Sequence, residues 1–261
     1  MFKMALALAG MLFATTAAGA QIMKQVPIEV DGLKRLYVYS APDLPRRPRV
    51  TPAPLPLLLW FHGGHGTEVP PGGAIVDAQA LVLNSGQYAA VAYLQACPEE
   101  EATDCTTTGG WDNGDLWGPA DRDLRFVDAV IADIRAHNNI DMMRIYAAGF
   151  SRGAFFTYYL ACRRDGLRRI VAAAGALNGQ LTCPTAAEPV LHIHDPFDPY
   201  ICWATLTTLC LTQTDQVETA EVGYQRWQGW APTSQLMLVP GAGHIFSRTW
   251  LPQIWAFFNA P

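Results

Sequence analysis

A serine between two glycines is the residue of this sequence best suited to covalent chemistry. The segment Gly149-Phe150-Ser151-Arg152-Gly153 matches the pattern Gly-x-Ser-x-Gly, in which a sharp strand-to-helix turn projects the hydroxyl above a sheet. The backbone N–H that follows such a serine lies at a helix N-terminus, where it can stabilise an oxyanion. The pattern also occurs by chance, but its place between an apolar run and a helical pattern indicates a nucleophilic serine.

A serine nucleophile needs a histidine base and a carboxylate that orients the base. On a turn of this kind the three follow in the order Ser, Asp, His, each after a later strand. Asp198 follows the apolar run 190–194, and His244 follows the run 234–239. We therefore assign His244 as general base and Asp198 as orienter. Asp195 is the alternative orienter, less favoured because it directly follows the strand.

A glycine-rich turn could complete the oxyanion site. The segment His62-Gly63-Gly64-His65-Gly66 ends an early apolar run, where a second N–H donor is commonly found in such sites. The alternative is a plain turn without a function. We expect the backbone N–H groups of Gly64 and Arg152 to be the donors, with His65 near the substrate.

A long connection over residues 98–120 carries two tryptophans. It is rich in Gly, Thr, Asp and Glu, and connections of that length in a compact domain are usually functional or disordered. We expect Trp111 and Trp117 to pack over the site and contact the substrate.

These residues must be positioned by alternating strands and helices. Continuous apolar runs are typical of strands buried on both faces of a parallel sheet; they cover 57–61, 89–96, 144–148, 190–194 and 234–239. Helical periodicity occurs over 124–137, 153–162, 216–230 and 250–259. The alternation predicts an α/β fold with a mostly parallel sheet and helices on both faces. Asp31-Gly32 predicts a hairpin turn between two earlier strands, 26–30 and 33–39.

The composition and the first twenty residues limit the class of protein and its location. Half of the 261 residues are apolar, 16% are charged and the net charge is −5, which excludes a disordered chain and gives no basic surface for nucleic acid. Lys3, the apolar run 4–13 and Ala18-Gly19-Ala20 predict a signal peptide over 1–20. The alternative is an uncleaved anchor. We expect a secreted or periplasmic monomer, a single domain over 21–261, with no membrane segment after cleavage.

Six cysteines lie after the expected cleavage site. They are Cys97, Cys105, Cys162, Cys183, Cys202 and Cys210. In an oxidising compartment an even number favours three disulfides, and no Cys-x-x-Cys spacing suggests a structural metal. Fifteen pairings are possible; we expect the local one, in which neighbours in this order pair and brace loops near the site.

The chain resembles the LpqC-type α/β-hydrolases, a group of secreted feruloyl and acetylxylan esterases and polyhydroxybutyrate depolymerase-like esterases. The resemblance runs in order over nearly all of residues 21–261 and is carried by Phe61-His62-Gly63-Gly64, the segment 144–153, Leu191-His192-Ile193-His194 with Asp198-Pro199, and Gly241-Ala242-Gly243-His244. It implies an α/β-hydrolase fold, no cofactor, and Ser151, Asp198 and His244 as the catalytic triad. Two positions depart from the family: Arg152 replaces a frequent Asn, and Asp195 replaces the Gly of His-Gly-x-x-Asp.

The resulting hypothesis is a serine carboxylic-ester hydrolase that forms an acyl-enzyme. Feruloyl or acetyl esters of plant polysaccharide are the expected substrates, and a polyester such as polyhydroxybutyrate is the alternative. Two other functional classes fit part of the pattern. His192 and His194 share one strand face as metal ligands would, but further ligands at short spacing are lacking. A non-catalytic module could hold a polymer with Trp203 and the two loop tryptophans, but a complete Ser/Asp/His set argues against it.

Overall fold

The computed structural model describes residues 21–42, 53–64, 89–97, 104–105, 110–112, 121–183, 187–205 and 218–261. The expected signal peptide over 1–20, His65, Trp117 and Cys210 lie outside these ranges.

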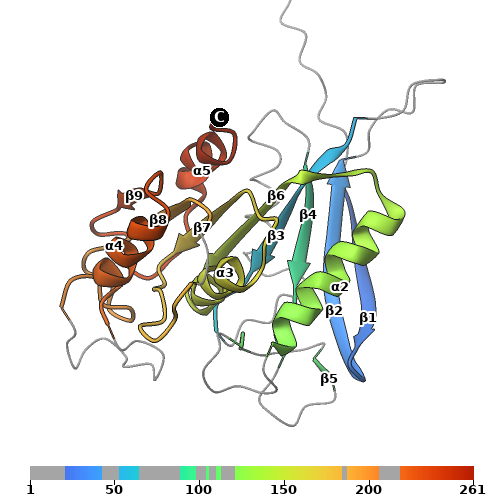
Figure 1. Cartoon of the computed structure of the whole chain (residues 1–261), viewed down its shortest axis with the longest axis horizontal. Coiled ribbons are helices and arrows are strands. Elements are labelled where there is room, and N and C mark those ends of the chain that lie inside the picture. The colour runs from blue at the N-terminus through green and yellow to red at the C-terminus, as the bar shows by residue number, and fades with distance from the viewer. Residues whose placement is uncertain are drawn as a thin grey trace, which may run out of the picture.

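One sheet runs through the described chain in the order β1-β2-β4-β3-β6-β7-β8-β9, with β5 paired beside β2 (Figure 1). The strands are β1 (Gln21–Val30), β2 (Leu33–Pro42), β3 (Leu55–Phe61), β4 (Ala90–Leu94), β5 (Asp104–Cys105), β6 (Ile140–Phe150), β7 (Arg169–Ala173), β8 (Val190–His194) and β9 (Gln235–Leu238). β1 and β2 pair antiparallel, as do β2 and β4, whereas every pair from β4 to β9 is parallel. The expected mostly parallel sheet is confirmed.

Alternate residues of the central strands face two separate cores. In β3, Leu57, Leu59 and Phe61 pack with α2 (Arg122–His137), α3 (Arg152–Arg163) and α4 (Ala220–Trp230). Leu58 and Trp60 point to the other face and pack with α5 (Leu251–Phe258), which follows the short 3₁₀ helix η1 (Arg248–Trp250). Both faces of the strand are therefore apolar, as the unbroken run predicts, and helices cover both faces.

Three local predictions can be compared with the structure. Asp31 and Gly32 have φ of 54° and 77°, the conformation of a two-residue hairpin turn, so that prediction is confirmed. The helix expected from residue 216 begins at Ala220, after Thr219 accepts a hydrogen bond from Val222 N. β7 was not predicted, because its five residues begin with an arginine and end in two alanines.

Two of the expected disulfides are present, Cys97–Cys105 and Cys162–Cys183. Cys202 is also disulfide-bonded, while its expected partner Cys210 lies outside the described residues. Among the described helices, none combines the length and the apolar character that crossing a bilayer would require.

Candidate active site

Ser151 lies on the turn between β6 and α3, where the backbone is strained. Its φ of 52° and ψ of −120° are rare for a residue with a side chain. The flanking glycines make this turn possible. A Cβ on Gly149 would lie 2.2 Å from Gly153 O, and a Cβ on Gly153 would lie 2.2 Å from Phe61 O. Any larger residue at either position would therefore push α3 away from β3 or β6.

The structure brings the three predicted side chains together. His244 Nε2 lies 2.9 Å from Ser151 Oγ, and His244 Nδ1 lies 2.8 Å from Asp198 Oδ2. The histidine and the aspartate come from the loops that follow β9 and β8, at the carboxyl ends of parallel strands. The order and spacing are those of a nucleophile, a base and an orienter.

Asp198 is held in place by its own loop. Its Oδ1 accepts hydrogen bonds from Tyr200 N (2.8 Å) and Ile201 N (3.0 Å). Burial raises the pKa of Asp198, but the hydrogen bonds from His244, Ile201 and Tyr200 outweigh it, so the pKa of this carboxyl is lowered. The group is therefore ionised where a histidine base is neutral.

Asp195, the alternative orienter, has a different place. Its carboxylate accepts hydrogen bonds from Phe197 N and from Gly243 N. It thus ties the loop after β8 to the loop that carries His244, without bonding the imidazole. Of the two aspartates, Asp198 has the geometry of an orienter.

The glycine-rich turn after β3 lies beside the serine. A Cβ on Gly63 would lie 3.4 Å from Ser151 Cβ, and a Cβ on Gly64 would lie 3.7 Å from Arg152 Cβ. Arg152 is the first residue of α3. The two expected oxyanion donors, the N–H groups of Gly64 and Arg152, are therefore on neighbouring segments at the serine.

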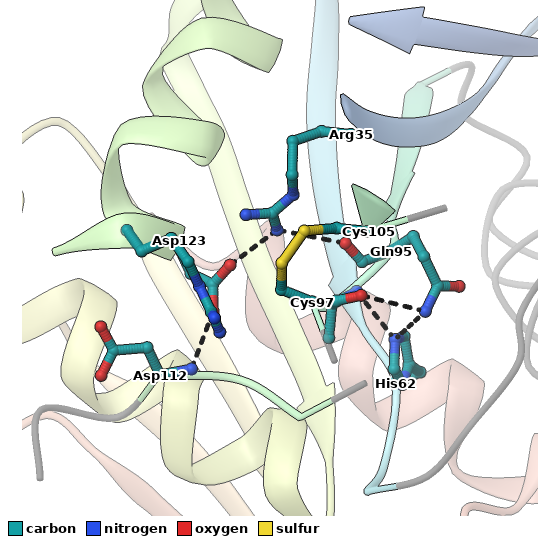
Figure 2. The surroundings of a disulfide bond; sticks show 9 residues. Arg35, His62, Gln95, Cys97, Cys105, Asp112 and Asp123 are labelled. Carbon is teal, nitrogen blue, oxygen red and sulfur yellow. Dashed lines mark hydrogen bonds and ion pairs between the residues drawn. A yellow bond between two sulfur atoms is a disulfide. The ribbon is translucent and has the colours of Figure 1, made fainter. Parts of the chain in front are cut away.

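His62 holds this turn in place through buried hydrogen bonds. Its side chain is 1% exposed; Nε2 accepts from Ala96 N at 3.1 Å and lies 3.3 Å from Gln95 Nε2 (Figure 2). Nδ1 lies 2.6 Å from Gly63 O. Burial lowers the pKa of His62 to about 4, although Gly63 O and Asp123 favour the charged form. The ring is therefore neutral near neutral pH.

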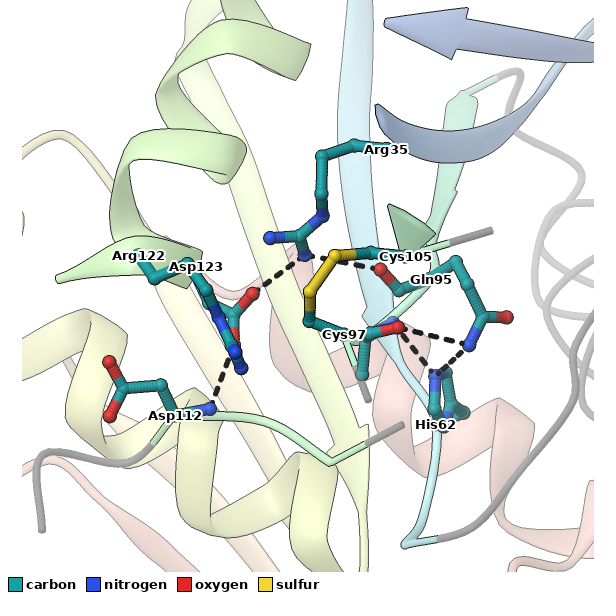
Figure 3. Close-up of polar contacts among 9 residues, drawn as sticks. Arg35, His62, Gln95, Cys97, Cys105, Asp112, Arg122 and Asp123 are labelled. Atoms are coloured by element: carbon teal, nitrogen blue, oxygen red, sulfur yellow. Dashed lines mark hydrogen bonds and ion pairs between the residues drawn. A yellow bond between two sulfur atoms is a disulfide. The ribbon is translucent and has the colours of Figure 1, made fainter. Parts of the chain in front are cut away.

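A buried ion cluster holds the segments that support His62. Asp123 Oδ1 accepts from Arg35 Nη2 at 2.6 Å, and Asp123 Oδ2 accepts from Asp112 N at 2.8 Å (Figure 3). Arg35 Nη2 also donates to Gln95 O. Burial raises the pKa of Asp123, but Arg35 and Arg122 outweigh it and the pKa is lowered. The carboxylate thus joins α2 to the chain on both sides of the Cys97–Cys105 disulfide.

The prediction that Trp111 contacts substrate is wrong. Its side chain is fully buried; it stacks on Phe156 and meets Phe61 edge-on. Its Nε1 donates to His62 O at 2.9 Å. The indole supports the end of β3 from within the core. His65 and Trp117, the other two expected contact residues, lie outside the described residues.

Aromatic side chains flank the histidine instead. The rings of Phe150 and Tyr200 each lie 5.0 Å from the His244 ring, centroid to centroid. Tyr200 is 45% exposed, and Phe197 and Ile245 on the same loops are 77% and 46% exposed. Sequence reasoning missed these residues, although each is the immediate or near neighbour of a predicted triad member.

His192 and His194 do not form a metal site with other described residues. Both are buried, and His192 Nε2 lies 3.1 Å from His194 Nδ1. Their remaining nitrogens face Tyr158 Oη and Ile201 O. In the part of the chain that the structure describes, no group of three or more His, Cys, Asp or Glu side chains could hold a metal. Trp203 packs on both rings and is itself buried.

The chain is similar in sequence to one curated protein and in fold to several solved structures. No protein-family profile matches it. It is 28% identical over 179 residues to NocK of Nocardia uniformis subsp. tsuyamanensis, whose esterase activity is an assignment by name; the match covers 66% of this chain and 47% of NocK. The chain thus spans about half the length of this relative.

Solved structures are similar over nearly the whole chain. The esterase Est22 matches with a TM-score of 0.64 at 15% identity, over 92% of this chain and 81% of Est22. A structure from Klebsiella pneumoniae subsp. pneumoniae, assigned by name as a dienelactone hydrolase, matches with a TM-score of 0.62 at 18% identity, over 93% of this chain and all of that one. Together with the sheet order and the strand-to-helix turn at Ser151, these matches show that the chain has the α/β-hydrolase fold.

Proposed function

We propose that this protein is a serine carboxylic-ester hydrolase with Ser151, His244 and Asp198 as its catalytic triad. The observation that carries the proposal is the continuous hydrogen-bonded set from Ser151 Oγ through the His244 ring to Asp198 Oδ2, placed on a strained strand-to-helix turn. The esterase names of NocK and Est22 agree with it.

The reaction proceeds through a covalent acyl-enzyme. His244 Nε2 takes the proton of Ser151 Oγ as the oxygen attacks the ester carbonyl, and Asp198 stabilises the imidazolium that forms. The carbonyl oxygen becomes an oxyanion, which accepts hydrogen bonds from the N–H groups of Gly64 and Arg152. The protonated His244 then gives its proton to the leaving alcohol. Water repeats the sequence and releases the acid.

The preferred substrates are feruloyl or acetyl esters of plant polysaccharide. Phe150 and Tyr200 beside His244 would give an aromatic acyl group two ring surfaces to pack on. A polyester such as polyhydroxybutyrate is the second candidate, since the exposed Phe197 and Ile245 would also suit an aliphatic chain. The reaction itself requires only side chains and backbone of this chain, and no cofactor.

Hydrolysis by the purified protein and by Ser151→Ala tests the proposal. The panel contains p-nitrophenyl acetate and butyrate, methyl ferulate, acetylated xylan and a polyhydroxybutyrate emulsion. We expect wild type to cleave esters and Ser151→Ala to lose at least about a thousandfold in kcat. Ser247→Ala, which removes a serine that caps η1, is the control and should retain activity. Equal activity of wild type and Ser151→Ala would overturn the triad assignment.

We further propose that the protein is exported as a monomer after removal of residues 1–20. Lys3, the apolar run and Ala18-Gly19-Ala20 support the cleavage. The disulfides Cys97–Cys105 and Cys162–Cys183 support an oxidising compartment. The net charge of −5 gives no reason to expect a nucleic-acid partner.

A further inference from the structure

A buried chain of hydrogen bonds joins α3 to the loop after β8, and the proposed reaction does not use it. Tyr158 Oη lies 2.8 Å from His192 Nδ1, and His192 Nε2 lies 3.1 Å from His194 Nδ1. At the far end His194 Nε2 lies 3.0 Å from Ile201 O. The three side chains are at most 1% exposed, so these contacts have no competition from solvent.

The chain can have only one direction. A carbonyl oxygen only accepts, so His194 Nε2 carries a proton and donates it to Ile201 O. Burial lowers the pKa of both histidines, so each ring is neutral and has one N–H. His194 Nδ1 must therefore accept from His192 Nε2, and His192 Nδ1 must accept from the Tyr158 hydroxyl. Every donor points toward Ile201.

Ile201, together with Tyr200, holds the carboxylate of Asp198 through its backbone N–H. Ile201 N donates to Asp198 Oδ1 at 3.0 Å, while the carbonyl of the same residue accepts from His194. The other carboxylate oxygen of Asp198 faces His244 Nδ1 at 2.8 Å. The direction in which Asp198 points therefore depends on where His194 holds Ile201.

We propose that His194 is a positioning residue of the active site, which fixes the 198–201 turn so that Asp198 stays aimed at His244. Tyr158 and His192 act through it, because His192 Nε2 donates to His194 Nδ1 and the Tyr158 hydroxyl donates to His192. The inference rests on the proposed function, because it gives His194 a role in the same triad. The chain of hydrogen bonds also links α3, which begins directly after Ser151, to the loop that carries Asp198.

The neutral state of His194 matters to this role. His194 Nε2 lies 3.9 Å from Asp198 Oδ2, and a charged ring there would compete with His244 for that oxygen. Within the described residues, the other ionisable groups that face these histidines are Asp195 and, near Tyr158, the hydroxyl of Tyr224. Burial outweighs the attraction of the two carboxylates and lowers the pKa of His194.

Two substitutions at His194 separate positioning from packing. His194→Leu removes the donor to Ile201 O, and we expect plateau kcat/KM on p-nitrophenyl acetate to fall about tenfold or more. The acid limb of its pH profile should move to lower pH by about half a unit, because a misplaced carboxylate stabilises the protonated base less. His194→Gln keeps an N–H near the same place and should restore most of both. A pure packing role would lower stability and leave the acid limb unchanged, which would overturn the proposal.

A second measurement needs neither turnover nor a variant at His194. Nitrogen-15 NMR of the histidine rings, in wild type and in Ser151→Ala, should show His192 and His194 as neutral Nε2–H tautomers throughout the pH range in which His244 gains its proton. An Nδ1–H tautomer of His194, or its protonation in that range, would overturn the proposal even if His194→Leu failed to fold. If wild type and Ser151→Ala hydrolysed esters equally, the proposed function would fail instead, and the tautomers would be unaffected.

Discussion

His62 immediately precedes the two glycines of the proposed oxyanion turn. Because its Nε2 accepts from Ala96 N, the neutral ring has its proton on Nδ1 and donates it to Gly63 O over 2.6 Å. The carbonyl of Gly63 and the N–H of Gly64 belong to one planar trans peptide and point in opposite directions. His62 therefore sets the direction of the N–H that would bind the oxyanion.

We expect His62→Ala to lower kcat about tenfold to a hundredfold with little change in KM, because the loss of a directed donor is felt mainly in the transition state. Affinity for a boronic acid that forms a tetrahedral adduct should fall in proportion. His137→Ala is the control, since that histidine is 72% exposed on α2. A raised KM at normal kcat would show instead that His62 acts on substrate binding.

Residue positions were predictable where they depend on the ends of strands. Ser151, Asp198 and His244 each follow an apolar run, and the structure brings them within hydrogen-bonding distance. Trp111 was misassigned because a position in a long connection does not show which way an indole faces. The supporting role of His62 was not predictable, because its hydrogen-bond partner is the backbone N–H of Ala96, 34 residues away. A backbone donor does not depend on the residue type, so the sequence does not reveal it.

The start of α3 lies in close contact with the end of β3. Gly153 faces Phe61 O and His62 O, which are backbone atoms that cannot rotate away. We expect Gly153→Ala to destabilise the fold by about 2 kcal/mol or more and to abolish ester hydrolysis, measured by urea unfolding and kcat/KM. Gly229→Ala in α4 is the control.

The control variant, Gly229→Ala, is not expected to lose stability. A Cβ on Gly229 would meet nothing within 4 Å, and alanine favours a helix over glycine by about 1 kcal/mol. Gly229→Ala should therefore be neutral or stabilising, with normal activity. If Gly153→Ala unfolded at the same urea concentration as wild type, the contact between α3 and β3 would be looser than the structure shows.

Most elements were predictable from the alternation of apolar runs and helical periodicity, down to β8, whose bounds match the expected ones. The two-residue strand β5 is one exception, and β7 is another. Its residues Arg169–Ala173 are buried from Ile170 onward, but small alanines between β6 and β8 fill little volume and give a weak hydrophobic signal. Its place was decided by pairing with both neighbours, which a single sequence does not reveal.

For the whole molecule, one intact-mass measurement tests the export and the cysteine pairing together. We expect the protein recovered from the medium or periplasm to have the mass of residues 21–261 less six hydrogens, and a peptide map to show Cys202 joined to Cys210. Retention of residues 1–20 would contradict the signal peptide. A mass higher by two hydrogens would contradict the third disulfide.

The two described disulfides join cysteines only 8 and 21 residues apart. A chain that crosses a membrane from its N-terminus delivers Cys97 and Cys105 together, well before Cys162 and Cys183 emerge. Each thiol thus meets its native partner while the competing thiols are still on the far side, and a short loop closes at small entropic cost. For an exported chain, the order of delivery would therefore favour this pairing among the fifteen that six cysteines allow.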